Sequence, residues 1–206
     1  MSKSLQQWQY TDYDEYVEVQ IAANIMKQTS VWVQRHVLVE IRKRHSQAEV
    51  GSVLCHGVRN GAELDMWREL YKEDVLIRGT EISPDNLPEN VICHDMQKPL
   101  EGEWKDSRWD LVYSNSFDHA MDPKQCLQTW CEQVSDRGAL VIDLYSVPRI
   151  TQYDPLYITP EALTELVPEN YFVESIRNHP LGPKAEHQLN NIITIRKVNY
   201  EEINND

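Results

Sequence analysis

The sequence lacks any long hydrophobic run. No segment of its 206 residues approaches the ~18 consecutive apolar residues that a membrane-spanning helix needs. Residues 1 to 8 also contain no apolar core of the length found in signal peptides. We therefore expect a cytoplasmic protein with no membrane partner. Internal repeats, low-complexity tracts and convincing linkers are absent as well, so the length predicts a single domain, residues 1 to 206.

Positive charge is scarce. The chain has 20 Lys and Arg against 33 Asp and Glu, which gives a formal net charge of −13. Such an acidic balance repels a phosphate backbone, so nucleic acid is not an expected partner. The densest basic segment, residues 35 to 45, falls on one short predicted helix, and a solvated helix face is its simplest interpretation.

Cysteine is scarce too, with four residues in the chain. All four lie in predicted strands or helices rather than in a spaced loop framework, so we expect reduced thiols at Cys55, Cys93, Cys126 and Cys131. Two of them precede a histidine, His56 or His94. Thiolate and imidazole suit zinc, but neighbouring side chains of a strand point to opposite faces. Neither pair can therefore chelate one ion, and no metal is expected.

What the sequence does contain is an apolar run, a turn with two glycines and the start of an amphipathic helix, in residues 53 to 64. The pattern predicts a strand that feeds a helix, the junction at which α/β folds bind nucleotide-like ligands. Gly57 suits a turn with positive φ or a close ligand approach, and Gly61 suits close packing at the helix start. Two glycines four residues apart also occur in many buried turns between a strand and a helix, so this spacing alone does not identify a ligand site.

Polar side chains follow three further apolar runs. Residues 75 to 80 lead into Glu81, twenty positions after Gly61. A carboxylate at that place can accept hydrogen bonds from both hydroxyls of a ribose. The other two runs, residues 91 to 93 and 109 to 113, are followed by His94, Asp95 and Met96 and by Ser114, Asn115 and Ser116. The pattern predicts that these strand ends converge on one nucleoside-sized slot.

In this order and spacing the segments resemble the class I S-adenosylmethionine-dependent methyltransferases, over roughly residues 50 to 200. The resemblance implies an α/β fold with a seven-stranded, mostly parallel sheet, helices on both faces and the last strand antiparallel, in the Rossmann-like methyltransferase arrangement. It also implies a helical cap in residues 1 to 48, an α/β core in 49 to 198 and an acidic tail in 199 to 206.

Two helices are predicted near the N-terminus. The first, residues 12 to 28, has apolar side chains at helical spacing, Tyr13, Val17, Ile21 and Ile25. The second has an apolar stripe made of Val33, Val37, Leu38 and Ile41. The resemblance implies that this pair covers the cofactor cleft. Tyr13, Tyr16 and Gln20 then either face the ligand or pack internally, which is the more common fate of tyrosines.

The second half of the chain is divided by caps and breakers. Asp122 and Pro123 begin a helix whose buried face reaches Val134, with Gly138 beyond its end. A buried strand is predicted over residues 139 to 145, a loop over 146 to 158 and a helix over 159 to 167. The closing strands are 171 to 177 and 191 to 197, joined by residues 179 to 190, and the acidic tail is expected to fray.

The resemblance also implies a set of residues that bind S-adenosyl-L-methionine. By analogy, Gly57, Arg59 and Gly61 line its methionine portion, Glu81 with the adjoining Ile82 binds the ribose, Asp95 and Met96 bracket the adenine, and Ser114, Asn115 and Ser116 lie where donor and acceptor meet. Two positions depart from the family pattern. Cys55 replaces a customary acidic residue and Arg59 replaces a third glycine, and we assign Arg59 to the methionine carboxylate.

The catalytic side has a weaker signature. Methyl transfer from a sulfonium is an in-line displacement, so the protein mainly aligns the acceptor and, for some acceptors, removes a proton. His119 and Asp118 are the candidates for that proton transfer, because histidine exchanges protons near neutral pH. Hydrogen bonding of His119 to the backbone is the alternative. Further loop residues are candidates for a lid, none of them singled out: Tyr145, Tyr153, His179 and His187.

Three functions stay open from the residues. The first is a methyltransferase that acts on a small-molecule acceptor, and the second is a non-catalytic module that binds S-adenosylmethionine or a nucleotide. The third is a nicotinamide-dependent oxidoreductase, in which Glu81 would serve equally well. The glycine pattern and the lack of a Tyr-x-x-x-Lys pair argue against the third. No spacing rule sets the acceptor, its reacting atom or the oligomeric state.

Overall fold

The computed structural model describes residues 4–46, 48–71, 74–145, 147–180 and 189–199. Most of the predicted connection before the last strand, residues 181–188 with His187, lies outside the described residues, as do residues 200–206 of the predicted acidic tail. Among the helices that are described, none is both long and apolar enough to span a bilayer.

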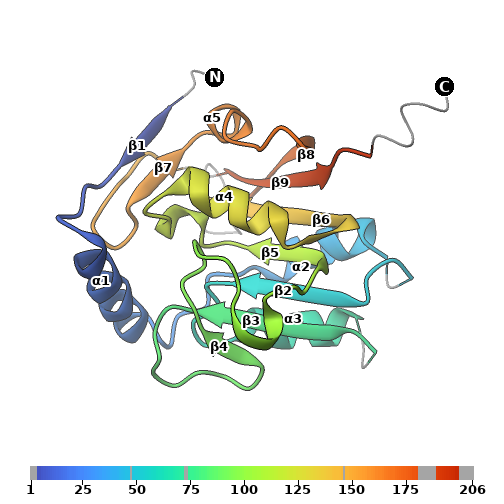
Figure 1. The fold of residues 1–206 in the computed structure, drawn as a ribbon, viewed down its shortest axis with the longest axis horizontal. Helices are drawn as coiled ribbons and strands as arrows, with labels where there is room; N and C mark the ends of the chain where they lie inside the picture. The colour runs from blue at the N-terminus through green and yellow to red at the C-terminus, as the bar shows by residue number, and fades with distance from the viewer. Residues whose placement is uncertain (1–3, 47, 72–73, 146, 181–188, 200–206) are drawn as a thin grey trace.

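A seven-stranded sheet forms the centre of the molecule, in the order β4-β3-β2-β5-β6-β9-β8 (Figure 1). Its strands are β2 Ser52–His56, β3 Leu76–Glu81, β4 Val91–Cys93, β5 Trp109–Ser114, β6 Val134–Leu144, β8 Tyr171–Pro180 and β9 Leu189–Lys197. The five neighbouring strands β4, β3, β2, β5 and β6 pair in parallel, whereas β9 runs antiparallel to both β6 and β8. The predicted sheet, with its last strand antiparallel, is confirmed.

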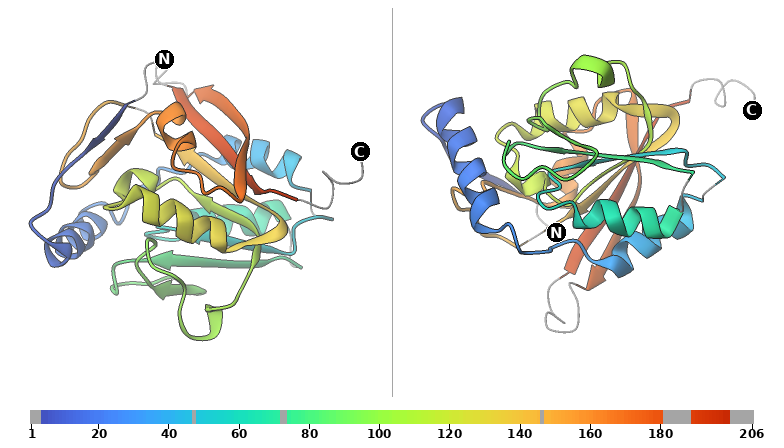
Figure 2. Two further views of the ribbon diagram at one scale, coloured as in Figure 1. Left: turned by 45° about the horizontal axis from the view of Figure 1, so that its top comes forward. Right: turned by 90° about the horizontal axis from the view of Figure 1, so that it is seen from below.

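Helices cover both faces of the sheet, because successive strand residues alternate between two apolar layers. On one face lie α2 Arg35–Arg44 and α3 Ala62–Tyr71, whose Leu38 and Trp67 pack with Val53 of β2. On the other face lie α4 Pro123–Glu132 and α5 Pro160–Thr164, packed with the next residue of that strand, Leu54. Figure 2 shows α2 and α3 on the side opposite α4.

Three helix starts have side-chain caps, and two of these, Asp122 and Thr159, were predicted. The side chain of Asp12 accepts a hydrogen bond from the Glu15 amide at the start of α1 Tyr13–Met26. Asp122 does the same for α4 and Thr159 for α5, and each is followed by a proline at the first helical position. These side chains stabilise the helices because the first amides of a helix have no partner within it. Short 3-10 turns occupy Gly102–Trp104 and Phe117–His119.

The predicted boundary between α4 and β6 is wrong. Helix α4 ends at Glu132, and β6 already begins at Val134, so Gly138 lies inside the strand rather than in the turn before it. A β-carbon on Gly138 would lie 2.7 Å from the carbonyl oxygen of Trp109. Glycine therefore lets β6 approach β5 closely at the point where their pairing changes register.

The predicted loop over residues 146 to 158 is also partly wrong. Its end forms β7 Leu156–Ile158, which pairs antiparallel with β1 Leu5–Gln7 in a separate two-stranded sheet. Three-residue strands contain too few residues for a periodic pattern, so neither was predicted. Helix α5 is shorter than expected and ends at Thr164, while Leu166 and Val167 pack on the core without helical backbone.

Candidate functional site

A cavity lies at the carboxyl ends of β2, β3, β4 and β5, beneath α1. In Figure 1 the arrowheads of β2 and β3 point toward that helix. The cavity encloses about 490 Å³ of empty space, part of it open to solvent. Four of its lining residues come from α1 and the rest from the end of β3 and the turns that follow the strands: Tyr16, Gln20, Ala23, Asn24, Gly57, Arg59, Glu81, Ile82, His94, Asp95, Met96, Ser116 and His119.

Gly57 forms the floor of the cavity where two turns approach each other. Its φ is +71°, and a β-carbon there would lie 2.7 Å from the β-carbon of Ser116. Glycine is needed because a side chain fits neither the backbone angle nor the space. Two residues later, Arg59 adopts a left-handed conformation with φ 44°. Its amide donates to Glu81 Oε2 at 2.7 Å, which holds this uncommon backbone in place.

Glu81 connects the β2 turn to the end of β3. Its side chain is buried, and its second oxygen, Oε1, accepts a hydrogen bond from the Ser83 amide at 3.2 Å. Both carboxylate oxygens are therefore oriented by backbone amides, and each keeps a further lone pair. Because Glu81 also lines the cavity, the carboxylate is positioned to accept hydrogen bonds from a ligand.

Asp95 ties the end of β4 to α1. Its Oδ2 accepts a hydrogen bond from the Tyr13 hydroxyl at 2.7 Å, and its Oδ1 accepts one from the Gln97 amide at 3.0 Å. Burial and then the Asp95 carboxylate raise the pKa of Tyr13, so the phenol keeps its proton and stays a donor. The Lys98 ammonium lies 4.1 Å from the centre of the Tyr13 ring. These contacts hold the first turn of α1 over the cavity.

The buried face of α1 differs from the predicted apolar stripe. Ile25 is 55% exposed, whereas Tyr16, Gln20 and Asn24 are buried. The reason is that α1 faces a polar cavity rather than the apolar core. Of the two predicted cap helices, only α1 lines the cavity, because α2 packs on the sheet beside α3.

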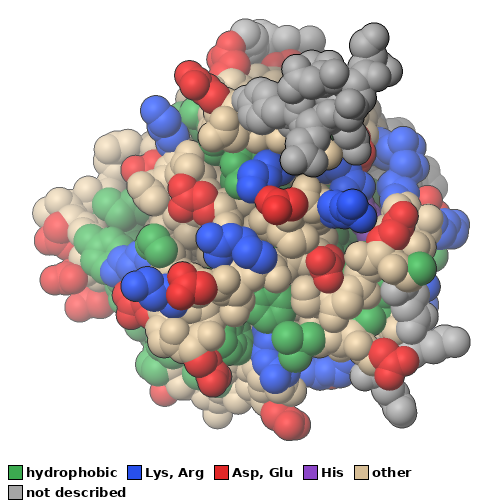
Figure 3. Space-filling view, turned by 45° about the vertical axis from the view of Figure 1, so that its right-hand side comes forward, with side chains coloured by type: hydrophobic (Ala, Val, Ile, Leu, Met, Phe, Trp, Pro, Cys, Tyr) green, Lys and Arg blue, Asp and Glu red, His purple; other side chains and the backbone are tan. Residues whose placement is uncertain are grey.

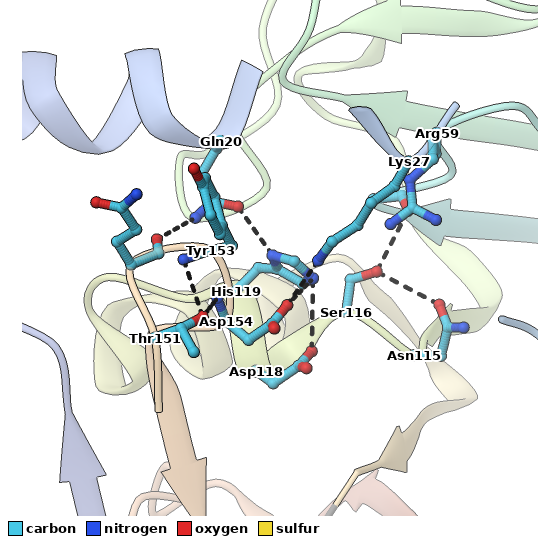
Figure 4. A network of polar contacts seen from close by, with 12 residues as sticks. Gln20, Lys27, Arg59, Asn115, Ser116, Asp118, His119, Thr151, Tyr153 and Asp154 are labelled. Carbon is cyan, nitrogen blue, oxygen red and sulfur yellow. Dashed lines mark hydrogen bonds and ion pairs between the residues drawn. The ribbon is translucent and has the colours of Figure 1, made fainter. Parts of the chain in front are cut away.

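A polar cluster lies around His119 at one end of the cavity, and two of its members, Gln20 and His119, line the cavity (Figure 4). Its Nδ1 lies 2.8 Å from Gln20 Oε1 on α1. Its Nε2 lies 3.7 Å from Asp154 Oδ1 and 4.0 Å from Asp118 Oδ1. The Lys27 ammonium binds Asp154 at 2.9 Å. The His119 side chain therefore joins three segments that are far apart in the sequence.

Opposing effects act on the two carboxyl groups of this cluster. Burial raises the pKa of Asp118, although His119 and Lys27 act against it. Burial alone would also raise the pKa of Asp154, but the hydrogen bond from Lys27 and the charge of His119 lower it below its usual value. Asp118, His119 and Asp154 each offer a ligand atom within 4.8 Å of the others. We assign no metal there, because Lys27 already supplies a cation to Asp154.

Four of the predicted site residues lie behind the cavity wall rather than in it. Gly61 has φ +74° and packs against the ring of Pro88, 2.9 Å from where its β-carbon would be. The Ser114 hydroxyl donates to the His56 carbonyl at 2.9 Å and accepts from the Ser116 amide at 3.0 Å. Asn115 Oδ1 accepts from the Ser116 hydroxyl, and Asp118 lies beyond His119. These residues shape the turns that carry the lining side chains.

Two lining residues, Ala23 and Asn24, were not predicted, and His94 was placed at a converging strand end without a role in the site. Asn24 follows Tyr16 and Gln20 at helical spacing, so a search for polar rather than apolar periodicity along residues 12 to 28 would have indicated it, whereas Ala23 has no polar side chain to reveal it. The ring of His94 projects from the turn after β4, and its Nε2 lies 2.9 Å from the Lys98 carbonyl oxygen.

The Cys55-His56 pair is structural. Cys55 is fully buried, and His56 stacks on Trp130 with ring centres 5.1 Å apart. The two ring nitrogens of His56 lie within hydrogen-bond distance of Thr80 Oγ1 and Gln133 Oε1. Burial lowers the pKa of His56 to about 3, so the ring is neutral and has no free nitrogen for a ligand. All four cysteines are free thiols, as predicted.

A buried carboxyl group in α3 leads to a prediction about stability. Burial raises the pKa of Glu63 from 4.5 to about 8. Between these values the native chain keeps a proton that the unfolded chain has lost, so the free energy of unfolding falls as the pH rises. We expect Glu63→Gln to raise that free energy by about 2–3 kcal/mol at pH 7, with little effect below about pH 4, where Glu63 is largely protonated in both states.

Chemical denaturation at several pH values measures this difference. Glu69→Gln is the matched control on the same helix, because Glu69 pairs with Arg35 at the exposed surface and such pairs contribute little. A Glu63→Gln protein that is less stable than the parent at every pH would contradict the prediction.

Acidic and basic side chains are interspersed on the face shown in Figure 3. Surface pairs include Arg196 with Glu174 at 2.7 Å and Lys197 with Asp136 at 2.6 Å. Each such exposed pair contributes at most about 1 kcal/mol to stability, so the fold depends on the two apolar layers instead.

The sheet order, the antiparallel β9 and the cavity at the strand ends define the fold of the class I methyltransferases. Among similar solved structures is the Burkholderia thailandensis 1,6-didemethyltoxoflavin-N1-methyltransferase with bound 1,6-didemethyltoxoflavin and S-adenosylhomocysteine. It has a TM-score of 0.66 and 15% sequence identity, and the match covers 96% of both chains. The glycopeptide N-methyltransferase MtfA with S-adenosylhomocysteine has a TM-score of 0.62 and 11% identity, over 82% of this chain and 89% of that chain.

The same fold also occurs in an enzyme that is named for a different reaction. The [4+2]-cyclase SpnF has a TM-score of 0.58 and 14% identity, over 78% of this chain and 80% of its own. At these identities the likeness concerns the fold alone. No protein-family model matches the sequence, and no curated protein matches it.

Proposed function

We propose that this chain is an S-adenosylmethionine-dependent methyltransferase that acts on a small-molecule acceptor. The observation that carries the proposal is that one cavity is lined by Gly57, Glu81 with Ile82, and Asp95 with Met96. The similar fold of two methyltransferases supports it, one with a bound small-molecule substrate and both with bound S-adenosylhomocysteine.

The lining residues fit the cofactor's chemical groups. Glu81 is proposed to accept hydrogen bonds from the two ribose hydroxyls, since its carboxylate is already oriented by two backbone amides. Asp95 and Met96 are proposed to contact the adenine. Arg59 lines the cavity, and its Nε atom is buried without a hydrogen-bond partner among the described residues. A carboxylate such as that of the methionine portion would satisfy this atom, because a buried donor without a partner is costly.

The bound cofactor would supply a methyl group that is already activated for displacement, with the electron pair of the broken bond left on sulfur. The protein then has to bring the acceptor's lone pair into line and take up any proton that the acceptor loses. We propose His119 as the group that receives this proton. Asp118 and Asp154 flank its Nε2 and would stabilise the resulting positive charge.

A second candidate function is a module that keeps the cofactor without transferring its methyl group. The structural neighbours do not favour this alternative, but the fold alone does not exclude it, since the [4+2]-cyclase SpnF shares the fold. Release of S-adenosylhomocysteine in the presence of an acceptor separates the two. No observation favours a nicotinamide-dependent oxidoreductase.

Isothermal titration calorimetry with S-adenosylmethionine tests the proposal directly. We expect saturable one-site binding, with a Kd in the micromolar range typical of enzyme ligands, and no comparable heat with reduced nicotinamide dinucleotide. A panel of small compounds with hydroxyl or amino groups, assayed for release of S-adenosylhomocysteine, then identifies an acceptor. A folded sample that gives no heat with S-adenosylmethionine would refute the proposed function.

A further inference from the structure

The hydrogen bonds of Gln20 fix which of its two amide atoms faces His119. The backbone carbonyl of Gln152 can only accept, and it lies 3.5 Å from Gln20 Nε2. The same carbonyl accepts from the Tyr10 hydroxyl, so the Tyr10 oxygen is in turn free to accept from Gln20 Nε2, at 3.2 Å. Turning the amide over would place its oxygen against a carbonyl oxygen. Gln20 therefore presents Oε1, an acceptor, to the histidine.

This orientation determines where the neutral His119 ring carries its proton. Because Gln20 Oε1 can only accept, Nδ1 at 2.8 Å must be the protonated nitrogen. The lone pair then lies on Nε2. Its neighbours Asp154 and Asp118 are 3.7 and 4.0 Å away, beyond a good hydrogen bond but near enough to stabilise a positive charge. Lys27 neutralises part of that field through Asp154.

We propose that Gln20 and Tyr10 are positioning residues that set the tautomer of His119, so that its Nε2 accepts the proton of a hydroxyl or amine acceptor. This inference rests on the proposed methyltransferase function and names its acceptor class. As the acceptor oxygen or nitrogen forms its bond to the methyl carbon, its bond to hydrogen breaks. The electron pair of that bond stays on the acceptor atom, and the proton moves to Nε2.

The contacts of Gln20 also make the tautomer of His119 depend on the position of α1 over the cavity. Gln20 lies in the middle of that helix, between Tyr13, which donates to Asp95, and Lys27, which binds Asp154. Tyr16, one turn before Gln20, lines the same cavity. His119 is therefore held in its Nδ1–H tautomer only when α1 covers the cavity. In that position α1 also shields the ligands beneath it from water.

Long-range ¹H–¹⁵N correlation spectra of the histidine rings test the tautomer without any acceptor. We expect the Nδ1–H form for His119 in the parent protein at a pH where the ring is neutral. Gln20→Leu removes the acceptor and is expected to give a mixture with the Nε2–H form. Gln20→Glu keeps an acceptor oxygen toward Nδ1. Its second oxygen replaces the Nε2 donor, and the Tyr10 hydroxyl can turn to donate to it, so we expect the Nδ1–H form to be restored. Gln28→Leu is the matched control, since the contact of Gln28 with Asn60 uses its backbone carbonyl.

Turnover with an acceptor from the panel gives a second measurement. We expect Gln20→Leu to lower kcat about 10- to 100-fold, because a histidine in the wrong tautomer cannot take the proton. The KM for S-adenosylmethionine should stay within about twofold, since Gln20 contacts the base and not the cofactor groups. Gln20→Glu should recover most of kcat. Tyr10→Phe keeps the ring and removes the hydroxyl, so it gives a milder loss and serves if Gln20→Leu fails to fold.

The Nε2–H form in the parent protein, or an unchanged ring in both Gln20→Leu and Tyr10→Phe, would overturn the inference. Loss of activity on adding EDTA would overturn it as well, because the cluster would then hold a metal. Titration with S-adenosylmethionine distinguishes failure of the tautomer inference from failure of the proposed function. A protein that binds S-adenosylmethionine but has the wrong tautomer refutes this inference alone, whereas a protein that does not bind it refutes the proposed function.

Discussion

Replacing His119 by asparagine is expected to lower kcat roughly 100- to 10,000-fold, the range over which a positioned general base accelerates a reaction. The asparagine amide can still donate to Gln20 from about the place of Nδ1, but it has no basic nitrogen in place of Nε2. The affinity for S-adenosylmethionine should change by less than about threefold, because the proposal places His119 beside the acceptor and not beside the cofactor. Steady-state kinetics with an acceptor from the panel and calorimetry measure the two quantities separately.

His94→Asn is the control for this experiment. His94 lines the same cavity, but its Nε2 lies 2.9 Å from the Lys98 carbonyl oxygen, which already occupies that nitrogen. We expect it to keep kcat within about threefold of the parent. If both histidine variants lose turnover equally, or if His119→Asn keeps most of it, proton transfer to His119 is not part of the reaction.

Replacing Glu81 by alanine is expected to weaken binding of S-adenosylmethionine roughly 100- to 1,000-fold, as the loss of two hydrogen bonds to a charged group predicts. A second effect acts in the same direction. The Arg59 amide loses its partner at 2.7 Å, so the left-handed turn beside the cavity is no longer held. Glu81→Gln keeps one acceptor oxygen and should weaken binding only about tenfold.

Calorimetry on both variants measures the loss, and thermal unfolding shows whether the fold persists. Glu89→Ala is the matched control, because Glu89 is exposed in the loop after β3 and does not line the cavity. If Glu81→Ala binds S-adenosylmethionine as tightly as the Glu89→Ala control does, the assignment of Glu81 to the ribose is wrong.

Local patterns account for the parts of the fold that were predicted correctly. Runs such as residues 53 to 55 are apolar on both faces because the strand is buried on both faces, and this shows in the sequence without its neighbours. Helix caps act within one helical turn, so the capping roles of Asp122 and Thr159 could also be predicted from the sequence. Gly57 was predicted for its turn, and its positive φ is confirmed.

The errors occur where a residue's role depends on a distant partner. Gly138 was taken for a helix end, but it is a strand residue whose neighbour is the backbone of Trp109. The apolar spacing of Tyr13, Val17, Ile21 and Ile25 does not mark the buried face of α1, because the residues beneath that helix belong to a polar cavity. Neither partner can be read from the local pattern, because both are brought in by the fold.

The sequence by itself determined the α/β class and the edge of the sheet at which the cavity forms, because strand periodicity and turn glycines are local properties. Only the tertiary structure decided which side chains face each other there. Gln20 and His119 are 99 positions apart, and Tyr13 and Asp95 are 82 positions apart. Such pairs arise when α1 comes to rest across the strand ends, and no spacing within a single helix or strand encodes them.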